Sequence, residues 1–275
     1  MTDQYAVIGN PVEHSLSPAI HAEFARATGQ DIAYRKIFSL LDGFREAALK
    51  FRDEGGKGLN VTLPFKQEAW KNLVTDTTPE AIDAEAVNTI DFRNGKIVGY
   101  NTDGIGLVRD LEQNLGFVIQ GKRVLLMGAG GATYGVVHPV LDRQPALLVV
   151  ANRTLQKAIQ LVAHFKKAQE ISAGRLSAKP YDQLSGSQFD LVINATSAGL
   201  KNEMPPLPGT VFARDALAYD MVYGKTTPFL KFAGALGARA ADGLGMLVEQ
   251  AAESFFIWRG VRPATRPVIE KLRKA

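Results

Sequence analysis

Apolar positions along the chain fall into short blocks separated by longer amphipathic stretches. Short apolar blocks predict buried strands, whereas apolar residues that recur with a helical period predict helices. In the first part of the chain the expected strands are Tyr5–Gly9, Ala33–Leu40 and Gly58–Leu63, and the expected helices are Ser17–Gly29 and Leu41–Gly55. Strands that alternate with helices in this way predict an α/β fold with a mostly parallel sheet.

Local signals indicate where these elements end. Ser17 is a suitable N-cap for the first helix, Pro18 fits its first helical position, and Gly29 can close it. Pro64 cannot donate a strand hydrogen bond, so the third strand should stop near Val61–Leu63.

The rest of the chain continues the alternation after one interruption. Ala86–Phe92 and Gly95–Asn101 flank the turn "RNG" and predict a β-hairpin, and Asn101–Gly116 is typical of a loop that enters a long helix. The later elements are expected as strands over Arg123–Met127, Ala146–Thr154, Phe189–Thr196 and Asp215–Tyr223, and as helices over Leu155–Glu170 and Gly243–Pro263. We expect two lobes with a cleft between them, because ligand sites favour domain interfaces.

Composition narrows the class of protein. The 275 residues carry a formal net charge of +4, and the positive charges are scattered rather than gathered in a basic arm, so no nucleic-acid partner is expected. A mild positive excess also suits small anionic ligands. Cysteine is absent, which is compatible with a reducing cytoplasm. We expect neither a secretory signal nor a membrane span, because no apolar run approaches the ~18 residues that a span needs.

A glycine-rich turn follows the strand at Arg123–Met127. The sequence "GAGGATYG" starts at Gly128 and precedes a helical pattern, the context in which a bare backbone and a helix N-terminus bind a phosphate. We therefore expect a dinucleotide at Gly128, Ala129, Gly130, Gly131 and Ala132. The alternative is a plain structural turn, because the spacing is G-x-G-G-x-x-x-G and Thr133 takes the third glycine position.

The end of the next strand indicates which dinucleotide. Sites for NAD place an acidic residue there, but this chain has Asn152, Arg153 and Thr154, with Lys157 one helical turn further on. The guanidinium of Arg153 can stack on adenine and pair with a 2′-phosphate. These residues favour NADP; the alternative is that Thr154 caps a helix and its neighbours are solvated.

Two residues in the first half are candidates for acid–base chemistry. Reducing a ketone with NADPH requires a proton donor near the carbonyl oxygen, and a lysine in a suitable environment can provide it. Lys66 follows the third strand, and Asp103 lies on a loop from which its carboxylate could hold that lysine. A lone lysine after a strand is more often a surface residue, so the motif around it has to decide.

The motifs "GNPVEHSLSP", "NVTLPFK", "AVNT", "NTDG", "GAGG", "NRT", "INAT", "DMVY" and "ADGLGMLVEQAA" occur in this order along essentially the whole chain. In this combination the sequence resembles the shikimate dehydrogenase family, NADP-dependent enzymes of aromatic amino-acid biosynthesis. The resemblance implies the reversible reduction of 3-dehydroshikimate to shikimate. It also implies a substrate-binding and catalytic domain over residues 1–104, completed by C-terminal helices at 244–275, and a Rossmann-like NADP-binding domain over 105–243.

The resemblance assigns roles residue by residue. Lys66 matches the family's catalytic acid and base, paired with Asp103. The residues that match substrate-binding groups are Ser15 and Ser17 for the carboxylate, Thr62, Asn88, Asp103 and Gln250 for the ring hydroxyls, and Tyr223 at the substrate edge. Met221 and Gly243 match cofactor contacts near the nicotinamide. For four of these residues another role stays open. Ser17 could cap its helix, and Asn88 could serve as a buried link in the hairpin. Gln250 could be the solvated edge of its helix, and Met221 could be part of the core.

Two departures from the family pattern concern the cofactor. The family runs Ser-Arg-Gly after the glycine pair, where this chain has Thr133, Tyr134 and Gly135, and Lys157 stands where an arginine is usual. Losing two guanidiniums should weaken the grip on phosphate, because lysine cannot pair bidentately.

Several alternatives therefore remain. One is a related dehydrogenase that uses quinate or NAD, and another is an NADPH-binding regulator without turnover. The histidines His14, His21, His138 and His164 lack metal-ligand spacing, so no metal is expected, although His14 could hydrogen-bond in the substrate loop. The expected partners are the small-molecule substrate and NADP, in a monomer or homodimer in the cytoplasm.

Overall fold

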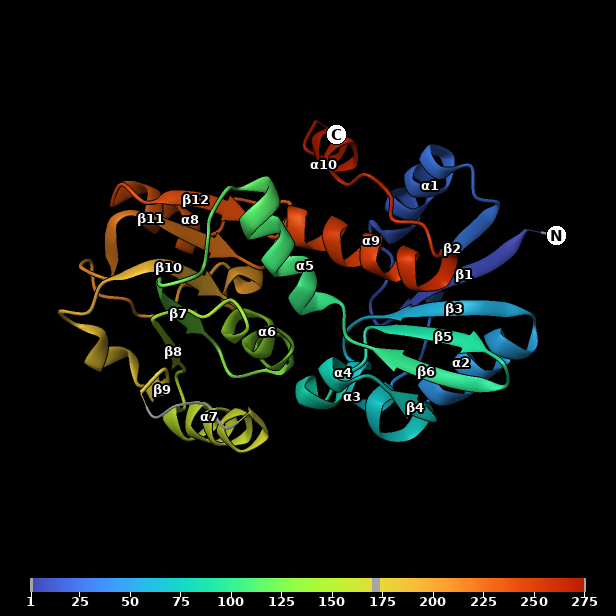
Figure 1. The fold of residues 1–275 in the computed structure, drawn as a ribbon, viewed down its shortest axis with the longest axis horizontal. Coiled ribbons are helices and arrows are strands. Elements are labelled where there is room, and N and C mark those ends of the chain that lie inside the picture. Colours follow the sequence, from blue (N-terminus) through green and yellow to red (C-terminus); the bar gives the residue numbers. More distant parts are fainter. Residues whose placement is uncertain (1, 170–173, 275) are drawn as a thin grey trace. The chain divides into compact units, whose positions relative to one another are not determined.

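The computed structural model describes residues 2–169 and 174–274. The chain divides into two compact units: residues 1–106 together with 247–275, and residues 107–246. Within the described residues each unit is built on a six-stranded sheet flanked by helices (Figure 1). The α/β fold class predicted from the alternating pattern is therefore confirmed.

The sheet of the first unit is mixed. Its strands are β1 (Asp3–Gly9), β2 (Ile32–Phe38), β3 (Gly56–Val61), β4 (Asp76–Thr77), β5 (Thr89–Arg93) and β6 (Lys96–Tyr100), in the order β2-β1-β3-β5-β6-β4. β1 is parallel to β2 and β3, whereas β5 is antiparallel to both β3 and β6. The β5–β6 pair is the hairpin predicted around the "RNG" turn.

The antiparallel hairpin brings three loops to one edge of this sheet. Asn60, near the end of β3, pairs in register with Thr89 at the start of β5, and Thr89 pairs with Tyr100 at the end of β6. The segments that follow β3, precede β5 and follow β6 therefore start from the same place. β3 itself ends at Val61, as the position of Pro64 predicts.

Helices cover both faces of this sheet. They are α1 (Ser17–Thr28), α2 (Phe44–Asp53), α3 (Lys66–Glu68), α4 (Pro79–Ala84) and α10 (Arg266–Leu272), with the π-helical turn η1 (Ala69–Leu73) and most of α9 (Leu244–Arg259). Phe44 and Phe65 stack inside one apolar cluster, with ring centroids 4.9 Å apart. In a second cluster, Phe24 of α1 packs with Phe255 of α9 and Ile269 of α10, so the C-terminal helix lies beside the first helix (Figure 1).

The sheet of the second unit is entirely parallel. Its strands are β7 (Arg123–Met127), β8 (Leu147–Ala151), β9 (Leu176–Lys179), β10 (Phe189–Asn194), β11 (Phe212–Asp220) and β12 (Arg239–Asp242), in the order β12-β11-β10-β7-β8-β9. Read from β9, this is the strand order of dinucleotide-binding folds, in which the direction of progression reverses between the first and fourth strands. Here that switch point lies between β7 and β10.

The helical segments of the second unit start with α5, whose first residues still belong to the first unit. They are α5 (Asp103–Arg109), η2 (Asp110–Asn114), α6 (Gly131–Leu141), α7 (Leu155–Gln169), η3 (Tyr181–Leu184), η4 (Ala198–Lys201) and α8 (Pro228–Ala235). Leu126 of β7, Val137 of α6 and Phe165 of α7 are fully buried in one apolar cluster. The long helix expected within Asn101–Gly116 is α5 continued by the π-helical η2.

Some predicted boundaries were wrong. Ser17 is the first residue of α1 rather than its cap; Leu16 holds the cap position, and its side chain makes no capping hydrogen bond. The helix expected to reach Pro263 ends at Arg259, because Gly260 turns the chain into the left-handed region with φ 68°. The predicted end of the helix at Glu170 lies outside the described residues.

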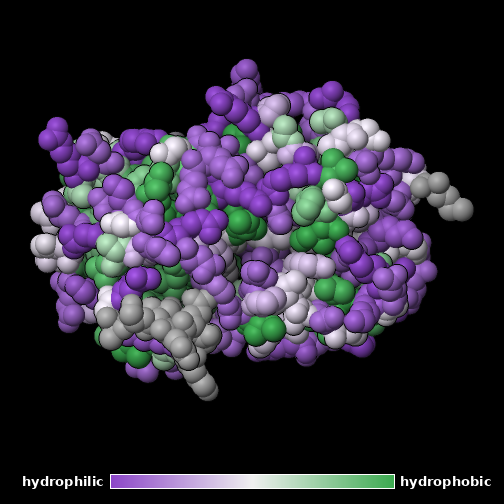
Figure 2. All heavy atoms as spheres, in the orientation of Figure 1, coloured by the Kyte–Doolittle hydropathy of each residue, from purple (hydrophilic) through white to green (hydrophobic). Residues whose placement is uncertain are grey.

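Hydrophilic residues dominate the face seen in Figure 2, with apolar residues scattered among them. Such scattering is normal for a folded domain. Within the part of the chain that the structure describes, no helix is long and apolar enough to cross a bilayer.

A histidine sits in the aromatic part of the first unit. His21 of α1 is fully buried, stacks on Tyr34 with ring centroids 4.3 Å apart, and contacts the rings of Phe24, Phe255 and Trp258. Neither ring nitrogen has a hydrogen-bond partner among the described residues. Burial lowers the pKa of His21 from 6.5 to about 3, so the imidazole stays neutral in the folded chain at ordinary pH.

This buried imidazole predicts a specific pH dependence of stability. Between pH 6.5 and about 3 the unfolded chain binds a proton at His21 that the folded chain does not, so the free energy of unfolding falls as the pH falls. His21→Phe should therefore lose less of its melting temperature than the wild type between about pH 7.5 and pH 5. Above about pH 7.5 the gap between the two proteins should be constant, and an unchanged slope below pH 6.5 would contradict the assignment.

Candidate active site

The edge of the first sheet brings Lys66 and Asp103 together. Lys66 opens α3 after β3, Asp103 opens α5 after β6, and Lys66 Nζ lies 2.6 Å from Asp103 Oδ2. The exposed fractions of the two side chains are 26% and 12%. Lys66 is therefore a partly buried, paired cation rather than a solvated surface charge.

Asn88 fixes the other side of this carboxylate. Its Nδ2 donates to Asp103 Oδ1 at 2.9 Å and to Gln250 Oε1 at 3.2 Å, and its Oδ1 accepts from the backbone N–H of Thr102 at 2.8 Å. Asn101 Oδ1 accepts from the N–H of Asp103 at 3.1 Å. The carboxylate thus has one oxygen on an amide and the other on an ammonium group, which leaves it little freedom to rotate.

The two serines form a separate pair at the start of α1. Ser15 Oγ lies 3.1 Å from Ser17 Oγ and accepts from the backbone N–H of Ser17 at 3.3 Å. Their position at a helix N-terminus is a natural place for an anion, because peptide N–H groups are free there. Thr62 directly follows β3 at the same edge of the sheet. Its N–H donates to the carbonyl of Ile8 on β1.

Further polar side chains surround these residues. Asn60, Thr89, Thr102 and Ser254 are buried, and hydrogen bonds join them to one another and to Asn88. Sequence reasoning missed all four. The signal available was a run of small polar residues at positions that an apolar strand or helix should fill, since such groups are buried only when they are bonded.

In the second unit the glycine turn closes the end of β7. Gly128 has φ 110°, and its N–H donates to the carbonyl of Ala151 at the end of β8 at 2.8 Å. A Cβ at Gly128 would lie 3.2 Å from the carbonyl oxygen of Ala195, next to β10. The backbone itself therefore requires glycine at this position.

The next two glycines are different. A Cβ on Gly130 or Gly131 would meet no atom within 4 Å, and neither residue has a positive φ. α6 starts at Gly131, and the N–H groups of Thr133 and Tyr134 turn back to the carbonyl of Gly130. The open space above the first turn of α6 can receive an anion that the fold itself does not fill.

The segment after β8 carries the basic residues. Asn152 Nδ2 donates to the carbonyl of Thr154 at 2.9 Å, while the side chains of Arg153, Thr154 and Lys157 are exposed. Burial raises the pKa of Tyr181 to about 12, and the charge of Arg153 opposes that rise. The segment from Asn152 to Lys157 contains two cations and no carboxylate.

The segment after β11 comes close to the start of α9. Met221 donates its N–H to the carbonyl of Asn194 at 3.0 Å, and Gly243 donates its N–H to the carbonyl of Val222 at 3.2 Å. A Cβ on Gly243 would overlap the carbonyl oxygen of Met221. Burial raises the pKa of Tyr223, which lies two residues after Met221.

Tyr134, which departs from the family pattern, packs inside the second unit. Its ring centroid lies 5.5 Å from that of His164 and 5.9 Å from that of Phe165, both on α7. The tyrosine therefore joins α6 to α7 and supplies no cation to the turn.

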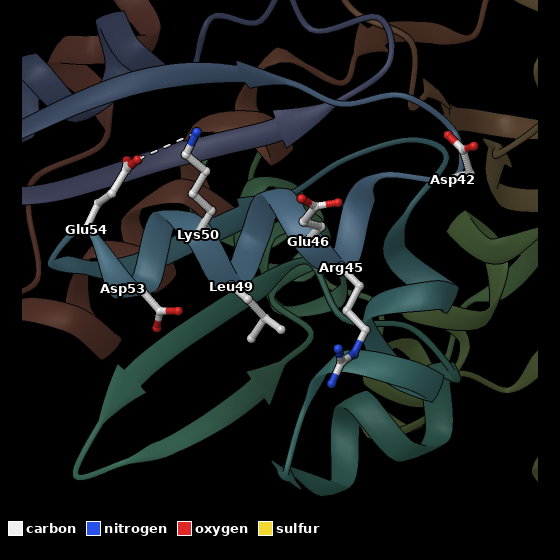
Figure 3. A pocket seen from close by; sticks show the side chains of 7 residues that line it. All are labelled: Asp42, Arg45, Glu46, Leu49, Lys50, Asp53 and Glu54. Carbon is white, nitrogen blue, oxygen red and sulfur yellow. Dashed lines mark ion pairs between the residues drawn. The ribbon is translucent and has the colours of Figure 1, made fainter.

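Neither the potential metal ligands nor the pocket along α2 adds a catalytic group to these sites. Among residues 2–169 and 174–274 no group of histidine and acidic side chains could hold a metal ion. The pocket drawn in Figure 3 runs along α2 and is lined by charged side chains and Leu49, with Lys50 and Glu54 paired at 4.0 Å. None of the predicted site residues lines it, and exposed ion pairs of this kind contribute little.

Family comparisons match three parts of the chain. Residues 7–90 match the shikimate dehydrogenase substrate binding domain, residues 110–201 match shikimate / quinate 5-dehydrogenase, and residues 243–273 match the shikimate 5'-dehydrogenase C-terminal domain.

Similar proteins cover nearly the full length. Shikimate dehydrogenase (NADP(+)) of Methylobacillus flagellatus is 56% identical over 274 residues, which is 99% of this chain and 100% of that protein. The crystal structure of an Ael1 enzyme from Pseudomonas putida is 49% identical with a TM-score of 0.93, over 98% of each chain. Shikimate 5-dehydrogenase from Thermus thermophilus, crystallised with NADP(H) and shikimate, is 32% identical with a TM-score of 0.88, over 99% of each chain.

The surroundings of Gly243 and Gly131 predict different effects on stability when a methyl group is added to each. Gly243→Ala should lower stability by about 1–3 kcal/mol, because the new Cβ meets a backbone carbonyl that cannot rotate away. Gly131→Ala, the matched control, should leave the melting temperature nearly unchanged, because its Cβ meets nothing. Thermal unfolding of both variants checks this; equal destabilisation would contradict the described geometry.

Proposed function

The chain belongs to the shikimate dehydrogenase family, and from this premise we propose how its residues divide the chemistry. The protein is an NADP-dependent oxidoreductase that reduces 3-dehydroshikimate to shikimate and catalyses the reverse reaction, a step towards the aromatic amino acids. The observation that carries the assignment of roles is the Lys66–Asp103 pair, held by Asn88 at the edge of the first sheet.

Lys66 is the proton donor in this proposal. NADPH supplies the hydride that adds to the ketone carbon. The Lys66 ammonium delivers a proton to the carbonyl oxygen, and in the oxidation direction the neutral amine removes it from the hydroxyl. Asp103 holds Lys66 in place and accepts a hydrogen bond from a neighbouring hydroxyl of the substrate. Acid–base help of this kind contributes about 10²–10⁴-fold to the rate.

The other polar groups of the first unit bind the rest of the substrate. Ser15 and Ser17 donate to its carboxylate at the N-terminus of α1, which spans 12 residues. Thr62, Asn88 and Gln250 bind the ring hydroxyls, and Tyr223 is assigned to the substrate edge. Asn88 and Gln250 already contact each other and so offer one surface for vicinal hydroxyls.

The glycine turn of the second unit suits NADP. The backbone from Gly128 to Ala132 would receive the pyrophosphate, since the space above Gly130 and Gly131 is open and the N-terminus of α6 faces it. Asn152, Arg153, Thr154 and Lys157 would hold the adenosine 2′-phosphate, and Met221 and Gly243 would contact the nicotinamide. With Tyr134 packed on α7, Arg153 is the principal cation for the phosphate.

The two units and the setting follow from these roles. We assign substrate binding and catalysis to residues 1–106 with 247–275, and NADP binding to residues 107–246. We place the protein in the cytoplasm as a monomer or homodimer; the absence of cysteine suits a reducing compartment.

Oxidation of shikimate, followed by the absorbance of the reduced cofactor, tests the function and the role of Lys66. The wild type should use NADP⁺, with quinate as the comparison substrate and NAD⁺ as the comparison cofactor. Lys66→Ala should lower kcat by several hundredfold or more and leave the KM for shikimate nearly unchanged, within the range of acid–base catalysis.

Lys57→Ala is the matched control, because Lys57 lies on β3 and its side chain is exposed. It should keep the wild-type rate. Lys66→Ala turning over at a rate close to that of the wild type would remove Lys66 from the proton transfer, whereas a wild type inactive on shikimate would remove the function itself.

Arg153→Ala should raise the KM for NADPH about tenfold or more, because one charge-assisted pair with phosphate is lost. The KM for NADH should change little. Arg214→Ala, a fully exposed arginine of the same unit, serves as the control for a general loss of positive charge. An equal rise for both cofactors in Arg153→Ala would show that Arg153 does not read the phosphate.

A further inference from the structure

One tyrosine lies between the helix that carries Ser17 and the buried polar groups behind Lys66 and Asp103. Tyr34 lies on the edge strand β2 and donates to Asn60 Oδ1 at 2.7 Å. Burial raises the pKa of Tyr34 well above 10, so the hydroxyl keeps its proton and can act as a donor throughout the physiological range. The Ser17 side chain, which is proposed to bind the substrate carboxylate, opposes part of the rise in the pKa of this hydroxyl.

From Asn60 the hydrogen bonds continue to the catalytic pair. Asn60 Nδ2 lies 3.1 Å from Thr89 Oγ1 and 3.2 Å from the carbonyl oxygen of Asn88. Thr89 Oγ1 donates to Asn88 Oδ1 at 3.1 Å, and Asn88 Nδ2 donates to Asp103 Oδ1. An unbroken series of hydrogen bonds therefore runs from Tyr34 to the carboxylate that holds Lys66, entirely within the first unit.

The tyrosine ring is fixed independently of its hydroxyl. It stacks on His21 with an interplanar angle of 7°, and His21 lies one helical turn after Ser17 on α1. Packing on His21 thus joins the Tyr34 ring to the helix that begins at Ser17. Tyr34 therefore connects α1, which begins at Ser17, to Asn60 near the end of β3.

We propose that Tyr34 is a positioning residue for shikimate oxidation, acting through helix α1 and Asn60 to fix the spacing between the carboxylate-binding serines and the Lys66–Asp103 pair. A rigid substrate that is gripped at its carboxylate can present its reacting hydroxyl to Lys66 only if that spacing is held. Misplacement by about 1 Å can cost about 10²-fold in rate. The proposal rests on the proposed function, because its effect is measured on shikimate.

A purely structural role for the hydroxyl is the competing explanation. A buried amide oxygen that loses its donor is destabilising wherever it lies, so stability alone does not separate the two roles. The neighbouring strand supplies the comparison. Tyr5 pairs in register with Tyr34, is buried, and stacks on Trp258 at 4.6 Å, but the side chain that opposes the rise in its pKa is Arg259 rather than a residue of the site.

The test compares Tyr34→Phe with Tyr5→Phe, each of which removes one hydroxyl and keeps the ring. Both should lower the melting temperature by a few degrees. Tyr34→Phe should lower kcat/KM for shikimate about tenfold or more while the KM for NADP⁺ stays within about twofold, a split that general destabilisation would not produce. Tyr5→Phe should keep both constants within about twofold of the wild type. Similar values of kcat/KM for the two variants would overturn the proposal.

A double-mutant cycle tests whether Tyr34 acts on the position of Ser17. Its outcome is a difference between two losses in rate and does not depend on stability. Tyr34→Phe should cost clearly less in a Ser17→Ala background than in the wild type, because the group it positions is already gone. The same fold-loss in both backgrounds would overturn the link. A wild type that does not oxidise shikimate would instead disprove the proposed function, so the two failures are distinguishable.

Discussion

The contact between the Lys66 ammonium and the Asp103 carboxylate is the interaction on which the proposed chemistry depends, and its geometry is a consequence of sheet topology. Lys66 and Asp103 are far apart in sequence, and each follows a different strand. They meet because β5 runs antiparallel between β3 and β6, so the end of β3, the start of β5 and the end of β6 share one edge. Asn88, which precedes β5, consequently reaches the carboxylate between them. If all three strands were parallel, the segment before β5 would lie at the opposite edge.

The polar groups behind this pair explain why it can hold one arrangement. Asn60, Thr89, Thr102 and Ser254 are buried, and each lies within hydrogen-bond distance of at least one other. Leaving one such group without a partner costs about 1–3 kcal/mol, so each bond restrains the next. The apolar clusters on both faces of the sheet exclude water from this layer. The glycine turn of the second unit differs from this bonded layer. Gly130 and Gly131 have no side chains, and the space beside them is open to a ligand.

The sequence predicted the parts that local rules govern. The alternation of strands and helices, the stop at Pro64, the hairpin around "RNG" and the turn at Gly128 all follow from backbone chemistry and periodicity. Assigning Lys66 needed the motifs around it, because a lone lysine after a strand carries no signal of its own. The network around Asn60 and the place of Tyr34 could not be predicted, since they depend on which strands are neighbours and on a helix from the far end of the chain. The shift at Ser17 has a local cause: Leu16 takes the cap position, and the serine side chain bonds outside the helix.

A crystal structure of the chain with bound shikimate tests the central claim most directly. The account predicts the reacting ring hydroxyl within about 3 Å of Lys66 Nζ, the distance at which a proton can be transferred, and a neighbouring hydroxyl within hydrogen-bond distance of Asp103. The substrate carboxylate should lie at Ser15 and Ser17. Shikimate bound with no hydroxyl near Lys66, or held in the charged pocket along α2, would contradict it.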